Sequence, residues 1–139
     1  MYLHIFFIFI IYFIMNDIEK RIKQINVENF VWIIYIFIIG LCLYANKYEK
    51  EYFCTNNIFA KEKYRNITIF IFIIAVIIYI YFFIDNYNDY KDLKPTDSLE
   101  KKNLNKLSLV GSTLVLISGL IFLYIAFVDE DLNVEVAFN

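Results

Sequence analysis

The sequence predicts an all-α integral membrane protein, a four-helix bundle built from two transmembrane helical hairpins. Two observations lead to this class. Hydrophobic residues make up 60% of the 139-residue chain, with a mean hydropathy of +0.56, and they gather in four long runs that contain almost no charge. Soluble domains are roughly 25% charged, whereas only 20% of these residues are charged. The composition therefore excludes a soluble enzyme with a cofactor domain, a coiled coil and a disordered chain.

The four apolar runs cover residues 1–15, 30–45, 67–84 and 107–128. At a rise of ~1.5 Å per residue they are roughly 22, 24, 27 and 33 Å long, against a hydrocarbon core of about 30 Å. The first two need flanking residues or local bilayer thinning to span it. Isolated strands cannot satisfy their backbone in lipid, and the alternation of a barrel wall is missing. We therefore expect helices in a single transmembrane domain over residues 1–128.

A signal peptide is the alternative for the first run. The run has no positively charged start, and Asn16 and Asp17 after it offer no small-residue cleavage site. We therefore expect an uncleaved first span.

The polar segment 16–29 joins the first two runs. It places Ile18, Ile22 and Ile25 on one helical face, and Glu19 precedes Lys23 by four residues, which is the favourable order for an ion pair. Asn16 or Asp17 can cap a helix there. The segment is either a short interfacial helix or an extension of both spans into water.

A helix start is predicted after Pro95, within the polar segment 85–106. Asp97 and Glu100 have the spacing of a capping box. The last helix should begin near Ser98 in water and enter the membrane near Leu107. The acidic tail 129–139 alternates apolar with polar or small residues, a period of two. It should pair with a partner strand or, in isolation, stay disordered.

Basic residues predict the orientation. With four spans, the first and third loops share one side and carry eight Lys and Arg, whereas the second loop carries five. The positive-inside rule then places both termini on the extracytoplasmic side of the cell membrane. A net charge of −2 gives no sign of nucleic-acid binding. The heavy use of Phe, Tyr, Ile, Asn and Lys resembles AT-rich coding and suggests a low-GC bacterium or its phage.

The apolar runs contain no Asp, Glu, Lys or Arg. Ionisable groups at membrane depth mark proton relays and ion sites, so no coupling residue and no intramembrane protease centre is evident. His4 should be solvated at the interface, and Cys42 and Cys54 form neither a disulfide framework nor a metal site. Asp85, Asp89 and Asp92 share a helical face but lack the pattern of a calcium loop. We expect no catalytic, cofactor or metal residue, and no small-molecule substrate.

Small residues distinguish the last run. Ser112, Gly119 and Ala126 recur every seven residues, and Ser108 precedes Ser112 by four. Such a stripe lets another helix approach closely. It can pack inside the protein's own bundle, or it can offer a face to a second copy or to another membrane protein. Gly111 and Ser118 lie on the adjacent flank.

These features predict a small multi-pass membrane protein that acts as a non-enzymatic interaction or scaffold subunit. Its expected partners are the lipid bilayer and, through the last helix, itself or another membrane protein. The alternative is an oligomeric pore or holin-like protein. A water-filled lumen needs a polar helix face, and the hydroxyl residues of the last run lie on two sides of the helix: Ser108, Ser112, Thr113 and Ser118.

Overall fold

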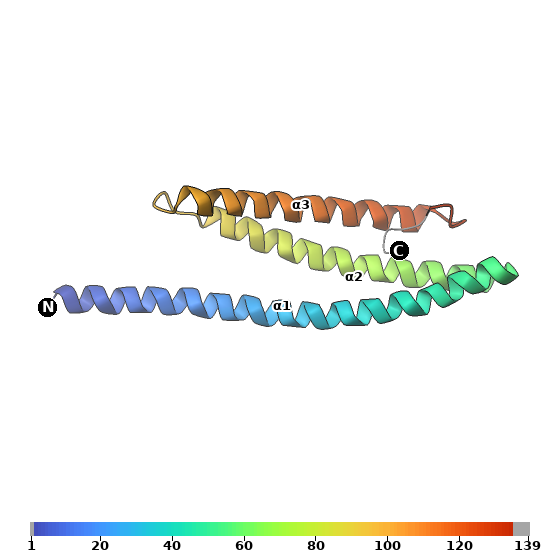
Figure 1. Ribbon diagram of the computed structural model, residues 1–139, viewed down its shortest axis with the longest axis horizontal. Coiled ribbons are helices and arrows are strands. Elements are labelled where there is room, and N and C mark those ends of the chain that lie inside the picture. Colours follow the sequence, from blue (N-terminus) through green and yellow to red (C-terminus); the bar gives the residue numbers. More distant parts are fainter. Residues whose placement is uncertain (1, 135–139) are drawn as a thin grey trace. The chain divides into compact units, whose positions relative to one another are not determined.

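The computed structural model describes the backbone of residues 2–134 and the side chains of residues 15–134. This part of the chain forms three helices and no strand: α1 (Tyr2–Thr55), α2 (Ile58–Lys91) and α3 (Leu99–Val128) (Figure 1). The all-α prediction is therefore confirmed. The chain divides into two units, Met1–Ile39 and Gly40–Asn139, and each is described by itself.

The predicted four-helix bundle is wrong, because the first two apolar runs belong to the single 54-residue helix α1. Residues 16–29 contain neither Gly nor Pro, and this polar segment is helical throughout. Helix continuity depends on backbone hydrogen bonds and not on hydropathy, so a change from apolar to polar residues does not end a helix. The expected hairpin between runs 1–15 and 30–45 is therefore not formed.

Ion pairs along the polar segment support its helical form. Glu19 Oε1 lies 3.4 Å from Lys23 Nζ, as the spacing predicts, and Arg21 lies 3.3 Å from Glu28. Asn16 and Asp17 cap no new helix, because α1 continues through them. Ile18, Ile22 and Ile25 are each at least 40% exposed, so this face of the described first unit remains apolar and open.

The second unit begins with the end of α1 and reverses through a two-residue turn, Asn56 and Asn57. Asn56 adopts a left-handed φ of 54°, a conformation that Asn tolerates better than most residues. Asn57 caps α2, because its Oδ1 accepts from the N–H of Phe59 at 3.1 Å, and its Nδ2 donates to Glu51 at 2.7 Å.

Aromatic rings on α1 also hold the start of α2. Lys63 Nζ lies 4.7 Å from the ring centroid of Tyr48 and 5.9 Å from that of Tyr44, both on α1. It also lies 5.8 Å from the ring centroid of Phe59, on α2 itself. Each ring face attracts the ammonium group electrostatically. This end of the α1–α2 hairpin is therefore fastened by polar and cation–π contacts.

The α2–α3 hairpin has a narrow apolar contact. Phe72 is almost completely buried and stacks on Phe122 of α3 with a centroid distance of 6.0 Å. Within the described part of α3 only Gly119 and Ala126 are buried. The buried residues of α2 are more numerous: Ala60, Tyr64, Ile71, Phe72, Ala75, Val76 and Ile78. The hairpin therefore packs through a few close contacts and leaves most large apolar side chains outside.

The predicted start of the last helix is confirmed, because Ser98 is the N-cap of α3 and its Oγ accepts from the N–H of Lys101 at 3.1 Å. The capping role expected of Asp97 is wrong. Its carboxylate accepts from Lys101 Nζ at 2.8 Å and from the N–H of Lys94 at 2.7 Å, so it braces the loop before the helix. The bond from Lys101, together with that from Lys94, lowers the pKa of Asp97.

The first part of the acidic tail forms a turn. The Asp129 carboxylate accepts from the N–H of Asn133 at 2.9 Å and from that of Val134 at 2.8 Å, and Leu132 has a φ of 54°. We expected the tail to form a strand or to be disordered. This prediction extends over residues 135–139, which lie outside the described residues. Within residues 129–134 the period-two pattern gives no strand.

Candidate interaction surfaces

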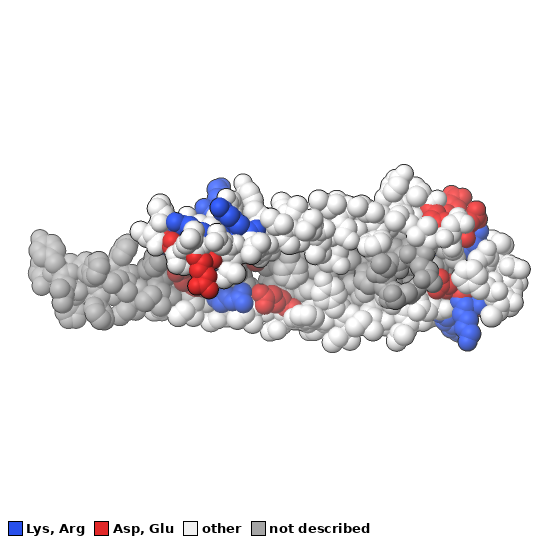
Figure 2. Space-filling view, turned by 45° about the horizontal axis from the view of Figure 1, so that its top comes forward, with Lys and Arg blue, Asp and Glu red and all other residues white. Residues whose placement is uncertain are grey.

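Three helices in the described part of the chain are long and apolar enough to cross a membrane. Figure 2 shows the face of the α2–α3 hairpin with its charged side chains in separate groups and uncharged surface between them. This distribution is typical of helices whose middle lies in hydrocarbon and whose ends reach the headgroups. The chain is therefore compatible with membrane insertion.

The predicted small-residue stripe lies partly in the contact with α2. Gly119 and Ala126 are buried, whereas Ser112 is half-buried and its hydroxyl donates to its own helix, to the carbonyl of Leu109 at 3.0 Å. Ser108 is exposed and donates to Asn86 Oδ1 of α2 at 2.6 Å. The hairpin itself thus uses Ser108, Gly119 and Ala126.

One flank of α3, beside its contact with α2, is apolar and open in the described structure, and Leu114 and Ser118 line an open hollow of about 340 Å³ there together with Phe72 and Tyr79 of α2. Leu114 is 61% exposed, Ile121 is 53% exposed, and Ser118 is exposed between them. A Cβ added at Gly111 would have no heavy atom within 4 Å. The flank noted in the sequence is therefore the side of α3 that has small residues and free space.

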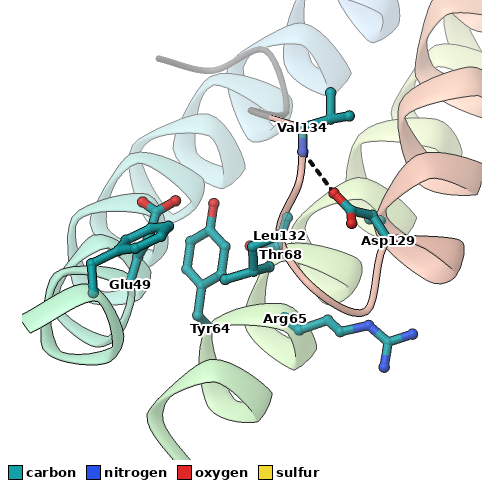
Figure 3. A pocket seen from close by; sticks show the side chains of 9 residues that line it. Glu49, Tyr64, Arg65, Thr68, Asp129, Leu132 and Val134 are labelled. Atoms are coloured by element: carbon teal, nitrogen blue, oxygen red, sulfur yellow. Dashed lines mark hydrogen bonds between the residues drawn. The ribbon is translucent and has the colours of Figure 1, made fainter. Parts of the chain in front are cut away.

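A small cavity of about 60 Å³ lies where the end of α3 meets α1 and α2 (Figure 3). The ring of Tyr64 stands between Glu49 of α1 and Leu132 of the tail, and the Arg65 guanidinium extends away from that ring. The remaining lining residues are Phe53, Thr68, Ala126, Asp129 and Val134. Drug-sized ligands need about 300–1,000 Å³, so this cavity has room for a few water molecules only.

Basic residues of α2 hold the end of α3 and the tail at this cavity. The Arg65 guanidinium donates to the carbonyl of Phe127, one of the last carbonyls of α3 that lack a helical partner, and its Nε is buried without a bonding partner. Lys61 Nζ lies 3.3 Å from Asp131. Hydrogen bonds from the N–H groups of Asn133 and Val134 lower the pKa of Asp129. The cavity is therefore best described as the place where the tail docks.

A larger open hollow of about 450 Å³ lies at the other end of the hairpin, between the end of α2 and the start of α3. Four of its lining residues are lysines: Lys91, Lys94, Lys102 and Lys106. The other lining residues are Tyr90, Leu93, Pro95, Leu99 and Asn103. No acidic side chain lines this hollow among the residues that the structure describes.

Among residues 15–134, the other candidate residues noted in the sequence form no metal-binding group. Cys42 is half-buried and Cys54 exposed, and both thiols are free. Among residues 15–134 no three His, Cys, Asp or Glu side chains are placed to hold a metal ion, the group Asp85, Asp89 and Asp92 included. His4 belongs to α1, and its side chain lies outside the described ones.

Comparison with protein-family models, with curated proteins and with solved structures gives no match. The candidate surfaces therefore stand on geometry and chemistry alone. The sequence indicated the α3 flank but missed the lysine hollow. Its signal in the sequence is the number of lysines between the last two apolar runs, which also predicts the orientation.

Proposed function

We propose that this chain is a non-enzymatic interaction subunit of the cell membrane, which binds a second membrane helix through the open flank of α3 that carries Gly111 and Ser118. The supporting observation is the open apolar surface around Gly111, where a Cβ would meet no atom within 4 Å. Small residues allow helix backbones to approach closely, and dispersion contacts then drive association in lipid. The absence of Asp, Glu, Lys and Arg from residues 30–45, 67–84 and 107–128 supports a role without proton or ion chemistry.

The proposed orientation follows from the continuous α1. One uninterrupted helix crosses a bilayer once, so residues 16–29 and the α2–α3 turn share a side and together carry eight Lys and Arg, against five around the α1–α2 turn. The positive-inside rule places the eight in the cytoplasm. The C-terminus then lies outside the cell, as the sequence predicts. The N-terminus lies in the cytoplasm, whereas four spans would place it outside.

The pore alternative requires a polar helix face. The hydroxyls of Ser112 and Thr113 both donate to the carbonyl of Leu109, and that of Ser108 donates to Asn86. These bonds leave Ser118 as the exposed serine or threonine hydroxyl of the apolar part of α3 without a partner among the described residues. These bonds argue against the pore hypothesis. A voltage-sensitive dye tests it, because a pore collapses the membrane potential after induction and an interaction subunit does not.

Cysteine crosslinking in native membranes tests the α3 face. In a Cys42→Ser/Cys54→Ser background, Ser118→Cys should crosslink to a second copy or to another membrane protein. The matched control Ser112→Cys, half-buried on the α2 side, should not crosslink. Gly111→Leu should abolish the Ser118→Cys product because a bulky side chain would occupy the small-residue surface. Crosslinking that is equal at both positions, or unaffected by Gly111→Leu, would refute the proposed face.

A further inference from the structure

The lysine hollow has a definite chemistry. Lys91 comes from the last turn of α2, Lys94 from the loop, and Lys102 and Lys106 from α3, so lysines from three segments line one hollow. Positively charged hollows with several N–H donors bind phosphate and other compact anions. Converging lysines that bound no counter-ion would repel one another. The chemistry of this lining therefore suits a compact anion.

The nearby acid Asp97 is already engaged. Its carboxylate is bonded to Lys101, which does not line the hollow, and to the N–H of Lys94. Lys102 Nζ donates to the carbonyl of Pro95 at 2.9 Å and so is held near the hollow. Among the residues that the structure describes, Lys91 and Lys106 have no ion-pair partner. These two charges are available to a ligand.

The hollow lies at the depth of lipid headgroups if the apolar runs lie in hydrocarbon. Lys106 directly precedes the apolar run 107–128, and Lys91 follows Ile84 by seven residues, about 10 Å along a helix. The headgroup region adds roughly 5–8 Å on each side of the core, so the backbone of Lys91 lies just beyond it and its long side chain must reach back to the phosphates. Tyr90, Leu93 and Leu99 also line the hollow, and apolar or aromatic side chains of this kind suit the glycerol and upper acyl region.

We propose that this hollow binds the phosphate of an anionic membrane lipid, with Lys91 and Lys106 as its principal ligands. A lipid is favoured over a free phosphate because the lining combines lysines with apolar side chains at the membrane surface. Basic pockets between helices on the cytoplasmic side suit anionic headgroups, which agrees with the orientation proposed above. The inference rests on the proposed membrane location but not on the α3 face. Crosslinking at Ser118 and lipid binding at the hollow can therefore fail independently.

Native mass spectrometry of the detergent-solubilised full chain tests this site. Phosphatidylglycerol and phosphatidylcholine of the same chain length are offered together. The wild type should retain phosphatidylglycerol preferentially, and Lys91→Gln/Lys106→Gln should lower that retention roughly thirty-fold, as expected for two lysines near a lipid surface. The control Lys47→Gln/Lys50→Gln removes the same charge from exposed residues near the opposite end of the hairpin and should retain the lipid as the wild type does.

Each other outcome overturns the proposal. Equal loss in both double variants would show non-specific attraction to charge, and equal retention of the two lipids would show that no anion site exists. Retention that inorganic phosphate removes at the concentration of the lipid would assign the hollow to a soluble phosphate. If the double variant loses its helical circular dichroism, the single variants Lys91→Gln and Lys106→Gln replace it, each with roughly a five-fold expected loss.

Discussion

Gly119 of α3 lies directly against the ring of Tyr79 of α2. A Cβ at Gly119 would come within 2.7 Å of Tyr79 Cδ2 and 2.9 Å of Cε2, closer than van der Waals contact permits. The two helices can therefore approach at this level only because α3 has no side chain here. At this one position of the seven-residue repeat in α3, a small residue is required because of the contact with Tyr79.

Substitution of Gly119 should weaken the hairpin. Gly119→Leu should destabilise it by roughly 1–3 kcal/mol, because the side chain must displace Tyr79 or separate the helices. The matched variant Gly111→Leu enters open space and should leave folding unchanged. The measurement is unfolding by SDS titration in micelles, followed by circular dichroism. Equal destabilisation by the two variants would contradict the contact described here.

Removal of the α3 cap should also lower stability. Ser98→Ala loses the acceptor of the Lys101 N–H and should cost about 1 kcal/mol, as is usual for an N-cap serine. Ser118→Ala, on the exposed face of the same helix, is the control and should change stability by less than about 0.5 kcal/mol. The same SDS titration compares them, and an unaltered midpoint for Ser98→Ala would show that the cap is dispensable.

The turn held by Asp129 should open in acid. Because its folded pKa lies below the ordinary value of 3.8, the ionised carboxylate stabilises the turn fully above that value. This contribution is lost as the pH falls below 3.8 and through the folded pKa. The amide resonances of Asn133 and Val134 in micelles should therefore shift together on acidification. In Asp129→Ala these amides should already have their acid-form shifts at neutral pH. An acid shift that persists in this variant would exclude Asp129 as its source.

Cys54 gives a direct test of orientation. It is exposed beside the α1–α2 turn, which we place outside the cell because it lies opposite the eight basic residues. A membrane-impermeant maleimide should therefore label Cys42→Ser protein in intact spheroplasts. The variant Cys42→Ser/Cys54→Ser should remain unlabelled. Labelling that requires lysis would reverse the orientation of the chain.

Local signals in the sequence predicted those features that depend on neighbouring residues. Pro95 and Ser98 predicted the start of α3 because a proline and a hydroxyl cap act within one helical turn. The Glu19–Lys23 pair could likewise be read from spacing. The continuity of α1 was missed because two separated apolar runs suggest two spans, although nothing in the intervening segment breaks a helix.

The surfaces depend on how helices pack, and sequence spacing alone did not resolve them. Gly119 and Gly111 are both small residues of one helix, yet one is against Tyr79 and the other is open. The side of α3 that meets α2 decides between them. Similarly, Lys91, Lys94, Lys102 and Lys106 line one hollow only because the loop brings the end of α2 to the start of α3.

The two-residue link at Asn56 and Asn57 has a consequence for biosynthesis. With so little chain between α1 and α2, the bonds of Asn57 to Glu51 and of Lys63 to the Tyr48 ring join partners that leave the ribosome almost together. Contacts between residues near in sequence form fastest, because little loop entropy is lost. The end of α1 and the start of α2 can thus pair before α3 is synthesised. When α3 follows, it packs last, against an α1–α2 corner that can already be in place.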